Sequence, residues 1–292
     1  MAIVGEGDFR YELDETWPKI PEGWSLGLCS DVAVDSHDRV YVFNRHRHPV
    51  AVFSEQGDFV TSWGEGEFKD PHGIYIGPDD SVWVTDTQDH VVTKHTPHGE
   101  KLLELGTRGR AMPTITNRGQ HGQPFNMPSG VALNAEGDIF VSDGYGNKRV
   151  HRFSADGELK LSWGASGLAA GEFAVVHNLG IDSQGRVLIC DRENSRIQIL
   201  DQEGGHIETW ERDGGTGDVY ISPDKLVYVT DGGRAAGVSI LTESGEVVSQ
   251  WHGAENGLEA PHGIWADSKG NVYVAEIGRP GHGQRVRKYA RI

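Results

Sequence analysis

The amino-acid sequence repeats one short pattern six times, and this repetition limits the fold more than any other feature. Each copy has a short stretch in which apolar and polar residues alternate, then a turn rich in Gly or Asp. A β-branched stretch such as "VYV", a third strand, a second turn and a fourth strand that often ends in Trp complete the copy. Alternation with a period of two predicts β-strands. The copies begin near Trp24, Pro71, Pro128, Val175, Gly215 and Pro261.

Four strands in each repeat of roughly 40–57 residues are typical of a propeller blade. The pattern resembles NHL-type propeller repeats over almost the whole chain. We therefore predict an all-β fold without helices, a six-bladed β-propeller of NHL-type repeats that forms a single domain over residues 1–292. The predicted blades cover residues 24–70, 71–127, 128–174, 175–214, 215–260 and 261–292.

The two ends of the chain are predicted to meet in one blade. The sixth copy stops after three strands, at Ile292, whereas the segment Asp8–Trp17 alternates like a strand and belongs to no copy. We expect residues 8–17 to supply the outer strand of blade six, which closes the ring and protects its sheet edges. Blade two has a long exit, Gly106–Met127, and loops of that length are often functional.

The composition of the chain limits the classes of partner and the cellular compartment that we expect. A net charge of −16 repels phosphate backbones and anionic lipids, so neither nucleic acid nor membrane is expected as a partner. The start of the chain lacks the features of a signal peptide, and no apolar run approaches the length of a membrane span. Cys29 and Cys190 are expected to be buried thiols in a reducing cytoplasm. No obligate protein partner is evident.

Histidine stands at the head of the first strand in alternate copies. The first strand of each blade lines the channel of a propeller, so three imidazoles on alternate blades should converge and leave one direction open. This donor set suits a catalytic zinc, although iron or another divalent metal accepts the same nitrogens. Chance placement of histidines in a polar channel is the competing interpretation. The head positions are, in chain order, Ser30, His72, Ser129, His177, Gly217 and His262.

The remaining histidines that we considered do not share this register, and they are expected at the surface or in loops. They are His46, His48, His90, His95, His98, His121, His252 and His282.

A second register closes the second strand of each copy with an acidic or amide side chain. Recurrence in every blade favours a structural role, the capping of backbone NH groups in turns. The positions are Asn44, Asp86, Asp143, Asp191, Asp231 and Glu276.

The residues just after these positions differ between copies, and three of them suggest chemistry. Arg45, Tyr145 and Arg192 should lie around the mouth of the metal channel. Arginine presents a fork matched to a carboxylate, which suggests a small carboxylate-bearing substrate. A tyrosine whose pKa is lowered from about 10 by a metal and cations can move a proton. Each of these residues taken singly is more often a salt-bridge or packing residue.

Three segments carry a closer resemblance. "VSDGYGNKRV" (141–150), "DRENSRIQI" (191–199) and "FNR" (43–45), with the spaced histidines, resemble peptidyl-α-hydroxyglycine α-amidating lyase. This resemblance implies a six-bladed propeller that splits a peptidyl-α-hydroxyglycine into an amide and glyoxylate. It also implies zinc at His72, His177 and His262.

The same resemblance places the catalytic tyrosine at Tyr145 and two functional arginines at Arg45 and Arg192. The chain departs from the family at two places. The disulfides of the animal enzyme cannot form here, and Gly263 replaces an aspartate that binds a structural calcium. Asp31 of blade one holds the equivalent position and is a candidate substitute at a doubtful calcium site.

The expected function is therefore a metal-dependent lyase that cleaves the C–N bond of an N-substituted α-hydroxy acid, with an amide or amine and a glyoxylate-like aldehyde as products. In enzyme terms this is a peptidylamidoglycolate lyase-like carbon–nitrogen or carbon–oxygen lyase. Two alternatives stay open. One is a metal-dependent lactonase or other hydrolase on the same propeller, and the other is a non-enzymatic NHL-type interaction scaffold.

Overall fold

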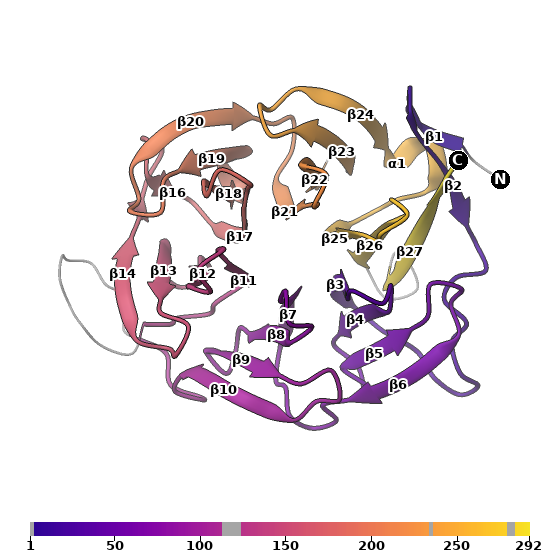
Figure 1. Ribbon diagram of the computed structural model, residues 1–292, viewed down its shortest axis with the longest axis horizontal. Coiled ribbons are helices and arrows are strands. Elements are labelled where there is room, and N and C mark those ends of the chain that lie inside the picture. Colours follow the sequence, from indigo (N-terminus) through magenta and orange to yellow (C-terminus); the bar gives the residue numbers. More distant parts are fainter. Residues whose placement is uncertain (1–2, 113–123, 234–235, 279–283) are drawn as a thin grey trace. The chain divides into compact units, whose positions relative to one another are not determined.

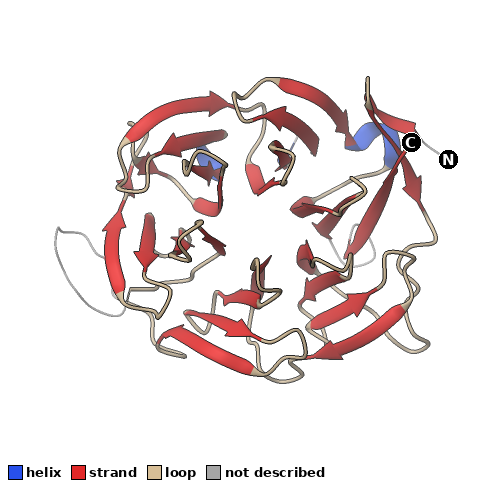
Figure 2. Cartoon of the chain, viewed as in Figure 1, coloured by secondary structure: helices blue, strands red, loops and turns tan. Residues whose placement is uncertain are grey.

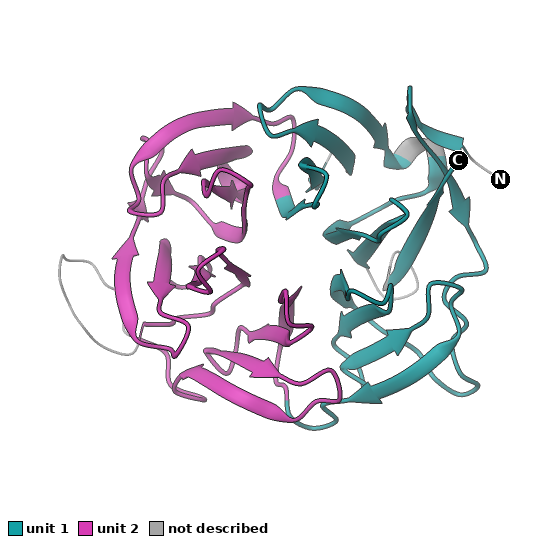
Figure 3. Ribbon diagram, viewed as in Figure 1, with its two compact units in different colours: residues 1–67, 217–292 teal, residues 68–216 magenta. Residues whose placement is uncertain are grey.

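The computed structural model describes residues 3–112, 124–233, 236–278 and 284–292, and strands dominate these ranges (Figures 1 and 2). The described chain divides into two compact units, one of residues 68–216 and one of residues 1–67 with 217–292 (Figure 3). Most of the sheets in each unit are antiparallel and four-stranded, and their strands follow one another in chain order.

The unit Phe68–Thr216 contains three complete sheets. The first has β7 (Pro71–Ile76), β8 (Val82–Asp86), β9 (Val91–His95) and β10 (Lys101–Gly106). The second has β11 (Gly130–Leu133), β12 (Ile139–Asp143), β13 (Arg149–Phe153) and β14 (Leu159–Trp163). The third has β17 (Val176–Ile181), β18 (Val187–Asp191), β19 (Arg196–Leu200) and β20 (His206–Glu211). A short parallel pair, β15 (Ala165–Ser166) and β16 (Glu172–Phe173), lies in the sequence between the second and the third of these sheets.

The other unit holds the remaining sheets. One has β3 (Cys29–Val34), β4 (Val40–Asn44), β5 (Val50–Phe53) and β6 (Phe59–Trp63). The next has β21 (Thr216–Ile221), β22 (Leu226–Asp231), β23 (Gly237–Thr242) and β24 (Val247–His252). The last has β25 (Pro261–Ala266), β26 (Val272–Ile277), β27 (Gln284–Arg291), β2 (Phe9–Asp14) and β1 (Ile3–Glu6). These six sheets confirm the predicted all-β, six-bladed propeller arrangement.

The prediction for the chain ends is also confirmed. Strand β2 pairs with the C-terminal strand β27, with Tyr11 opposite Arg291 and Asp14 opposite Lys288. The predicted segment 8–17 contains the whole of β2. Strand β1, which the sequence pattern did not indicate, adds a fifth strand outside β2. The sixth blade is therefore assembled from both ends of the chain.

The cores lie between neighbouring sheets of the same unit. In the 68–216 unit, Phe140, Phe173 and Leu179 belong to one buried cluster, and Trp83, Phe125 and Ile139 to another. In the other unit, Trp17 packs against Phe53 and Tyr273. Burying one side chain of this size stabilises a fold by about 1.5–3 kcal/mol, so alternate residues of each strand hold the blades together. Cys29 and Cys190 are buried free thiols, as predicted.

Some expectations need correction or stay predictions. The predicted all-β fold is confirmed, and helical geometry in the described ranges is confined to short turns such as η1 (Arg192–Asn194), a 3-10 turn, and α1 (Gly253–Asn256), a single α-helical turn. His95 is buried in β9 rather than exposed, because its ring hydrogen-bonds the Thr93 hydroxyl, 2.9 Å away. His121, His282 and residues 113–123 of the Gly106–Met127 loop lie outside the described residues. The single domain over 1–292 stays a prediction.

Candidate active site

Each head-of-strand histidine sits where the pairing between the first and second strands of its blade is interrupted. The register shifts between Pro71 and Ile74, between Val176 and Leu179, and between Pro261 and Gly263. Interruptions of this kind bend a strand and re-aim the side chains within it. The histidines His72, His177 and His262 therefore leave the ordinary alternation of the strand. All three are buried, and each offers one ring nitrogen to a metal ion.

Backbone carbonyl groups orient two of these imidazoles. His72 Nδ1 lies 2.7 Å from the carbonyl oxygen of Ser129, and His262 Nδ1 lies 2.5 Å from that of Ser30. A carbonyl only accepts, so each Nδ1 carries the proton and each Nε2 presents a lone pair. This is the tautomer that metal-ligating histidines adopt, with the second nitrogen held by a carbonyl or carboxylate. The described residues therefore fit a metal centre with imidazole ligands.

The hydroxyl of Tyr145 joins the two histidines of the 68–216 unit. Tyr145 Oη lies 2.9 Å from Nε2 of His72 and 2.9 Å from Nε2 of His177. The two imidazole rings meet edge to face, with centroids 4.9 Å apart. Two nitrogens that reach one oxygen atom at the same short distance point to a common centre. The sequence placed these three residues at one mouth, and the structure brings them together.

Arg192 completes this group. Its Nη1 donates to Tyr145 Oη at 3.0 Å, and its guanidinium lies 5.2 Å from the centroid of the Tyr145 ring. The rest of the fork faces Glu193, with Nε 2.9 Å and Nη2 2.8 Å from Oε1. The guanidinium therefore supports the tyrosine oxygen on one side and already holds a carboxylate on the other. Glu193 was not singled out from the sequence, although it directly follows Arg192.

The backbone that carries Tyr145 is closely packed. A Cβ on Gly144 would lie 2.0 Å from the carbonyl oxygen of Val176, and one on Gly146 would lie 2.2 Å from the side chain of Asn126. Lys148 Nζ donates to the carbonyls of Gly144 and Tyr145, at 2.8 and 3.1 Å. Burial lowers the pKa of Lys148, and the nearby positive charge of Arg192 acts in the same direction.

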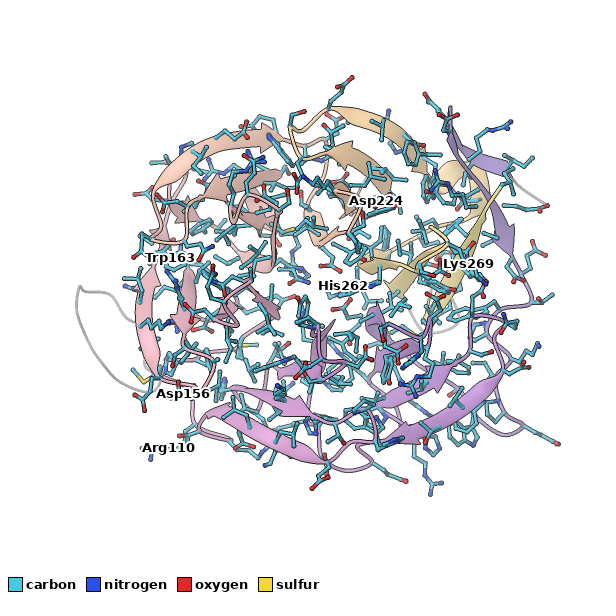
Figure 4. The ribbon with its side chains drawn as sticks, viewed as in Figure 1. Arg110, Asp156, Trp163, Asp224, His262 and Lys269 are labelled. Carbon is cyan, nitrogen blue, oxygen red and sulfur yellow. The ribbon has the colours of Figure 1, made fainter. Side chains whose placement is uncertain are left out.

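Two predicted site residues belong to the other unit. His262, labelled in Figure 4, lies in β25, and Arg45 follows β4 as an exposed residue. The backbone NH of Arg45 donates to the Leu28 carbonyl at 2.8 Å, which fixes the start of its loop. The catalytic roles predicted for Arg45, Arg192 and Tyr145, and the metal role of the histidines, stay predictions.

The side chains that close the second strands have the structural role expected of them. Asp86 Oδ1 accepts the backbone NH groups of Gln88 and Asp89, and Glu276 Oε1 accepts that of Glu259. Asp143 accepts the NH of Asn126. These carboxylates are buried and tie each loop to its blade.

Asp31 occupies the space beside Gly263. Its Oδ1 accepts the NH of Val32 at 2.8 Å and would lie 2.1 Å from a Cβ on Gly263. An aspartate at position 263 would collide with this carboxylate, so the two acidic side chains exclude each other in this arrangement. Calcium binding at Asp31 stays a prediction.

Comparison with known proteins agrees with this architecture. A family model described as the NHL repeat matches residues 125–153 and 173–200, the segments that contain Tyr145 and His177. The solved streptogramin B lyase structure has the same fold, with a TM-score of 0.64 at 15% identity over 96% of this chain and 87% of that one.

Two curated relatives are similar in sequence. Peptidyl-alpha-hydroxyglycine alpha-amidating lyase 1 of Drosophila melanogaster is 30% identical in an alignment 220 positions long, gaps included, which covers 64% of this chain and 39% of the fly protein. NHL repeat-containing protein 3 of Homo sapiens is 32% identical in an alignment 303 positions long, gaps included, which covers 96% of this chain and 84% of the human protein. The chain belongs to the NHL repeat family.

Proposed function

We propose that this protein is a metal-dependent lyase that cleaves the carbon–nitrogen bond of a small N-substituted α-hydroxy acid. The products would be an amide or amine and a glyoxylate-like aldehyde. The observation that carries this proposal is the position of Tyr145 Oη, within 3.0 Å of two imidazole nitrogens and one guanidinium nitrogen. The similarity to relatives named as amidating lyases supports the same reaction class.

In this proposal, His72, His177 and His262 hold a divalent metal, with zinc the first candidate. Three neutral imidazoles are a donor set that zinc accepts while one coordination position stays open for a reactant. When bound, such an ion lowers the pKa of a coordinated hydroxyl group and neutralises charge that develops on its oxygen. All three imidazoles are buried.

Tyr145 is the proposed proton carrier. As the phenolate, it takes the proton from the substrate hydroxyl, and the electrons of that O–H bond form the new carbonyl group. The C–N bond then breaks, its electron pair goes to nitrogen, and Tyr145 returns the proton to that nitrogen. Arg192 stabilises the phenolate through the hydrogen bond from Nη1. No net proton is gained or lost by the enzyme.

The carboxylate of the substrate needs a cation that fixes its orientation. Arg192 and Arg45 are the proposed partners, because a guanidinium fork binds a carboxylate through two parallel hydrogen bonds. For Arg192 the substrate would have to displace Glu193, which now occupies the fork. Such an exchange leaves no buried charge unpaired, because Glu193 pairs with the guanidinium before binding and the substrate carboxylate pairs with it afterwards.

A panel of α-hydroxyglycine conjugates, assayed for glyoxylate with and without a chelator, tests this function. We expect glyoxylate release that stops when the metal is removed and returns when zinc is restored. Tyr145→Phe protein is the control for spontaneous breakdown of the substrate. Hydrolysis of lactones by a protein that is indifferent to Tyr145→Phe would instead support the lactonase alternative. A protein without bound metal and without either activity would support the scaffold alternative.

A further inference from the structure

In the odd-numbered blades, the position that corresponds to the histidine is Ser30, Ser129 or Gly217, and the two serines contact the histidines of other blades. Ser129 and Ser30 are completely buried and provide the carbonyl groups that orient His72 and His262. Both serines also have a hydroxyl group, and the two hydroxyls are used differently. The difference between their hydrogen-bond partners suggests that one of the two serines positions the ligands of the proposed metal centre.

The Ser129 hydroxyl reaches the neighbouring blade. Ser129 Oγ donates to the carbonyl oxygen of Val176 at 2.9 Å, and its contact with the Ser142 carbonyl of its own blade is longer, at 3.3 Å. Val176 immediately precedes His177. The hydroxyl of one buried serine therefore fixes the peptide group that leads into the second histidine, while its carbonyl orients the first.

The backbone at His177 needs such support. Regular pairing between β17 and β18 is interrupted from Val176 to Leu179, so the strand ladder does not hold this stretch in the usual way. The same Val176 carbonyl also lies against Gly144, which carries the Tyr145 loop. A shift of Val176 would consequently displace both the imidazole of His177 and the phenol of Tyr145.

We infer that Ser129 is a positioning residue for the metal centre: its hydroxyl holds the Val176 carbonyl beside His177 and the Tyr145 loop, and its own carbonyl orients His72. The inference rests on the proposed function, because it requires that these histidines bind a metal. Loss of a group that orients metal ligands typically weakens metal affinity by about 10–100-fold. We expect that range for Ser129→Ala.

Ser30 offers a matched control. It has the same register, the same burial and the same carbonyl contact to a histidine. Its hydroxyl, however, donates to the Phe43 carbonyl of its own blade, at 3.1 Å. Ser30→Ala therefore removes a buried hydroxyl of equal size without touching the backbone beside a histidine, and its zinc affinity should stay within about twofold of that of the original protein.

The experiment measures the zinc dissociation constant of the full chain by competition with a chelator, together with the melting temperature of the metal-free proteins. The expected result is similar melting temperatures for both variants and weakened zinc binding for Ser129→Ala only. Equal zinc affinity in the two variants overturns the inference and leaves the proposed function standing. Failure of the original protein to bind zinc, iron or another divalent metal overturns both. If Ser129→Ala does not fold, Ser129→Cys, which keeps a weaker donor, is measured against the same criteria.

Discussion

The two compact units have the same strand pattern but differ in the chemistry they present. In residues 68–216, the hydroxyl of Tyr145 lies within hydrogen-bonding distance of His72, His177 and Arg192. In the other unit, His262 is buried, and a backbone carbonyl orients its ring in the same way as that of His72. The blade repeat therefore reproduces the burial and orientation of the histidine. The loop after the second strand supplies the side chain beside it, Tyr145 or Arg192.

The largest expected effects come from the histidines themselves. His72→Ala and His262→Ala should each lose bound metal and turnover, because the proposed centre needs ligands from both units. Elemental analysis after dialysis and glyoxylate release measure these losses. His95→Ala is the control, since His95 is equally buried and its ring nitrogens lie 2.9 Å from the Thr93 hydroxyl and 3.2 Å from the Gly99 carbonyl, both within its own blade. Metal and activity retained in His262→Ala would mean that residues 68–216 act alone.

Tyr145→Phe removes one oxygen atom from the centre of the 68–216 group. We expect kcat to fall by about 10²–10⁴-fold, the usual contribution of a general acid–base group, while zinc stays bound. Steady-state kinetics and metal content measure the two quantities separately. Unchanged kcat in this variant would remove Tyr145 from the reaction.

Gly144→Ala moves the loop that carries Tyr145 without altering any functional group. The new Cβ would meet the Val176 carbonyl at 2.0 Å, so the loop or the His177 segment must shift. A displacement of about 1 Å in a catalytic group costs roughly 100-fold in rate. We expect a lower kcat with nearly unchanged KM, checked alongside the melting temperature. An unchanged kcat would show that the backbone at Val176 or Gly144 can shift to accommodate the new methyl group without displacing Tyr145.

Arg45→Met asks whether the exposed arginine of the other unit contributes to substrate binding. Loss of a charge-assisted hydrogen bond costs about 1.5–3 kcal/mol, which corresponds to a rise in KM of about 10–100-fold. Arg47→Met is the matched control, because Arg47 is exposed on the same loop and pairs with Glu65. Equal KM values for the two variants would restrict carboxylate recognition to Arg192.

Glu193→Gln should have the smallest effect and the opposite sign. It removes the carboxylate that competes for the Arg192 fork, so KM should decrease about two- to fivefold, in line with about 0.2–1 kcal/mol for an exposed ion pair. The difference should shrink as salt is added. A raised KM would mean that Glu193 orients the guanidinium for substrate rather than competing with it.

The regular features of the molecule could be predicted from the sequence because they recur. Alternation and turn residues indicated the six blades, and the odd segment at residues 8–17 indicated a strand shared between the chain ends. The positions of Tyr145 and Arg192 beside two of the histidines followed from comparing the same register in every copy. Repetition makes such positions comparable even in a single sequence.

Features that depend on local backbone geometry were missed. No particular residue type signals the interruption of strand pairing at Val176. The contacts of Ser129 and Ser30 with the histidines use backbone carbonyl groups, which every residue has, so the sequence could not indicate them. His95 was placed at the surface because polarity alone does not reveal a partner such as Thr93. The head-of-strand serines were a usable signal, since small residues with a hydroxyl recur beside the histidines.

The pairing of β2 with β27 also bears on how the protein is made. Strand β2 precedes its partner β27 by most of the described chain, so during synthesis β2 keeps an unpaired edge until β27 has been made. Exposed edges invite pairing with other chains. Chaperone dependence should therefore be greatest in the interval before β27 has been made and has paired with β2.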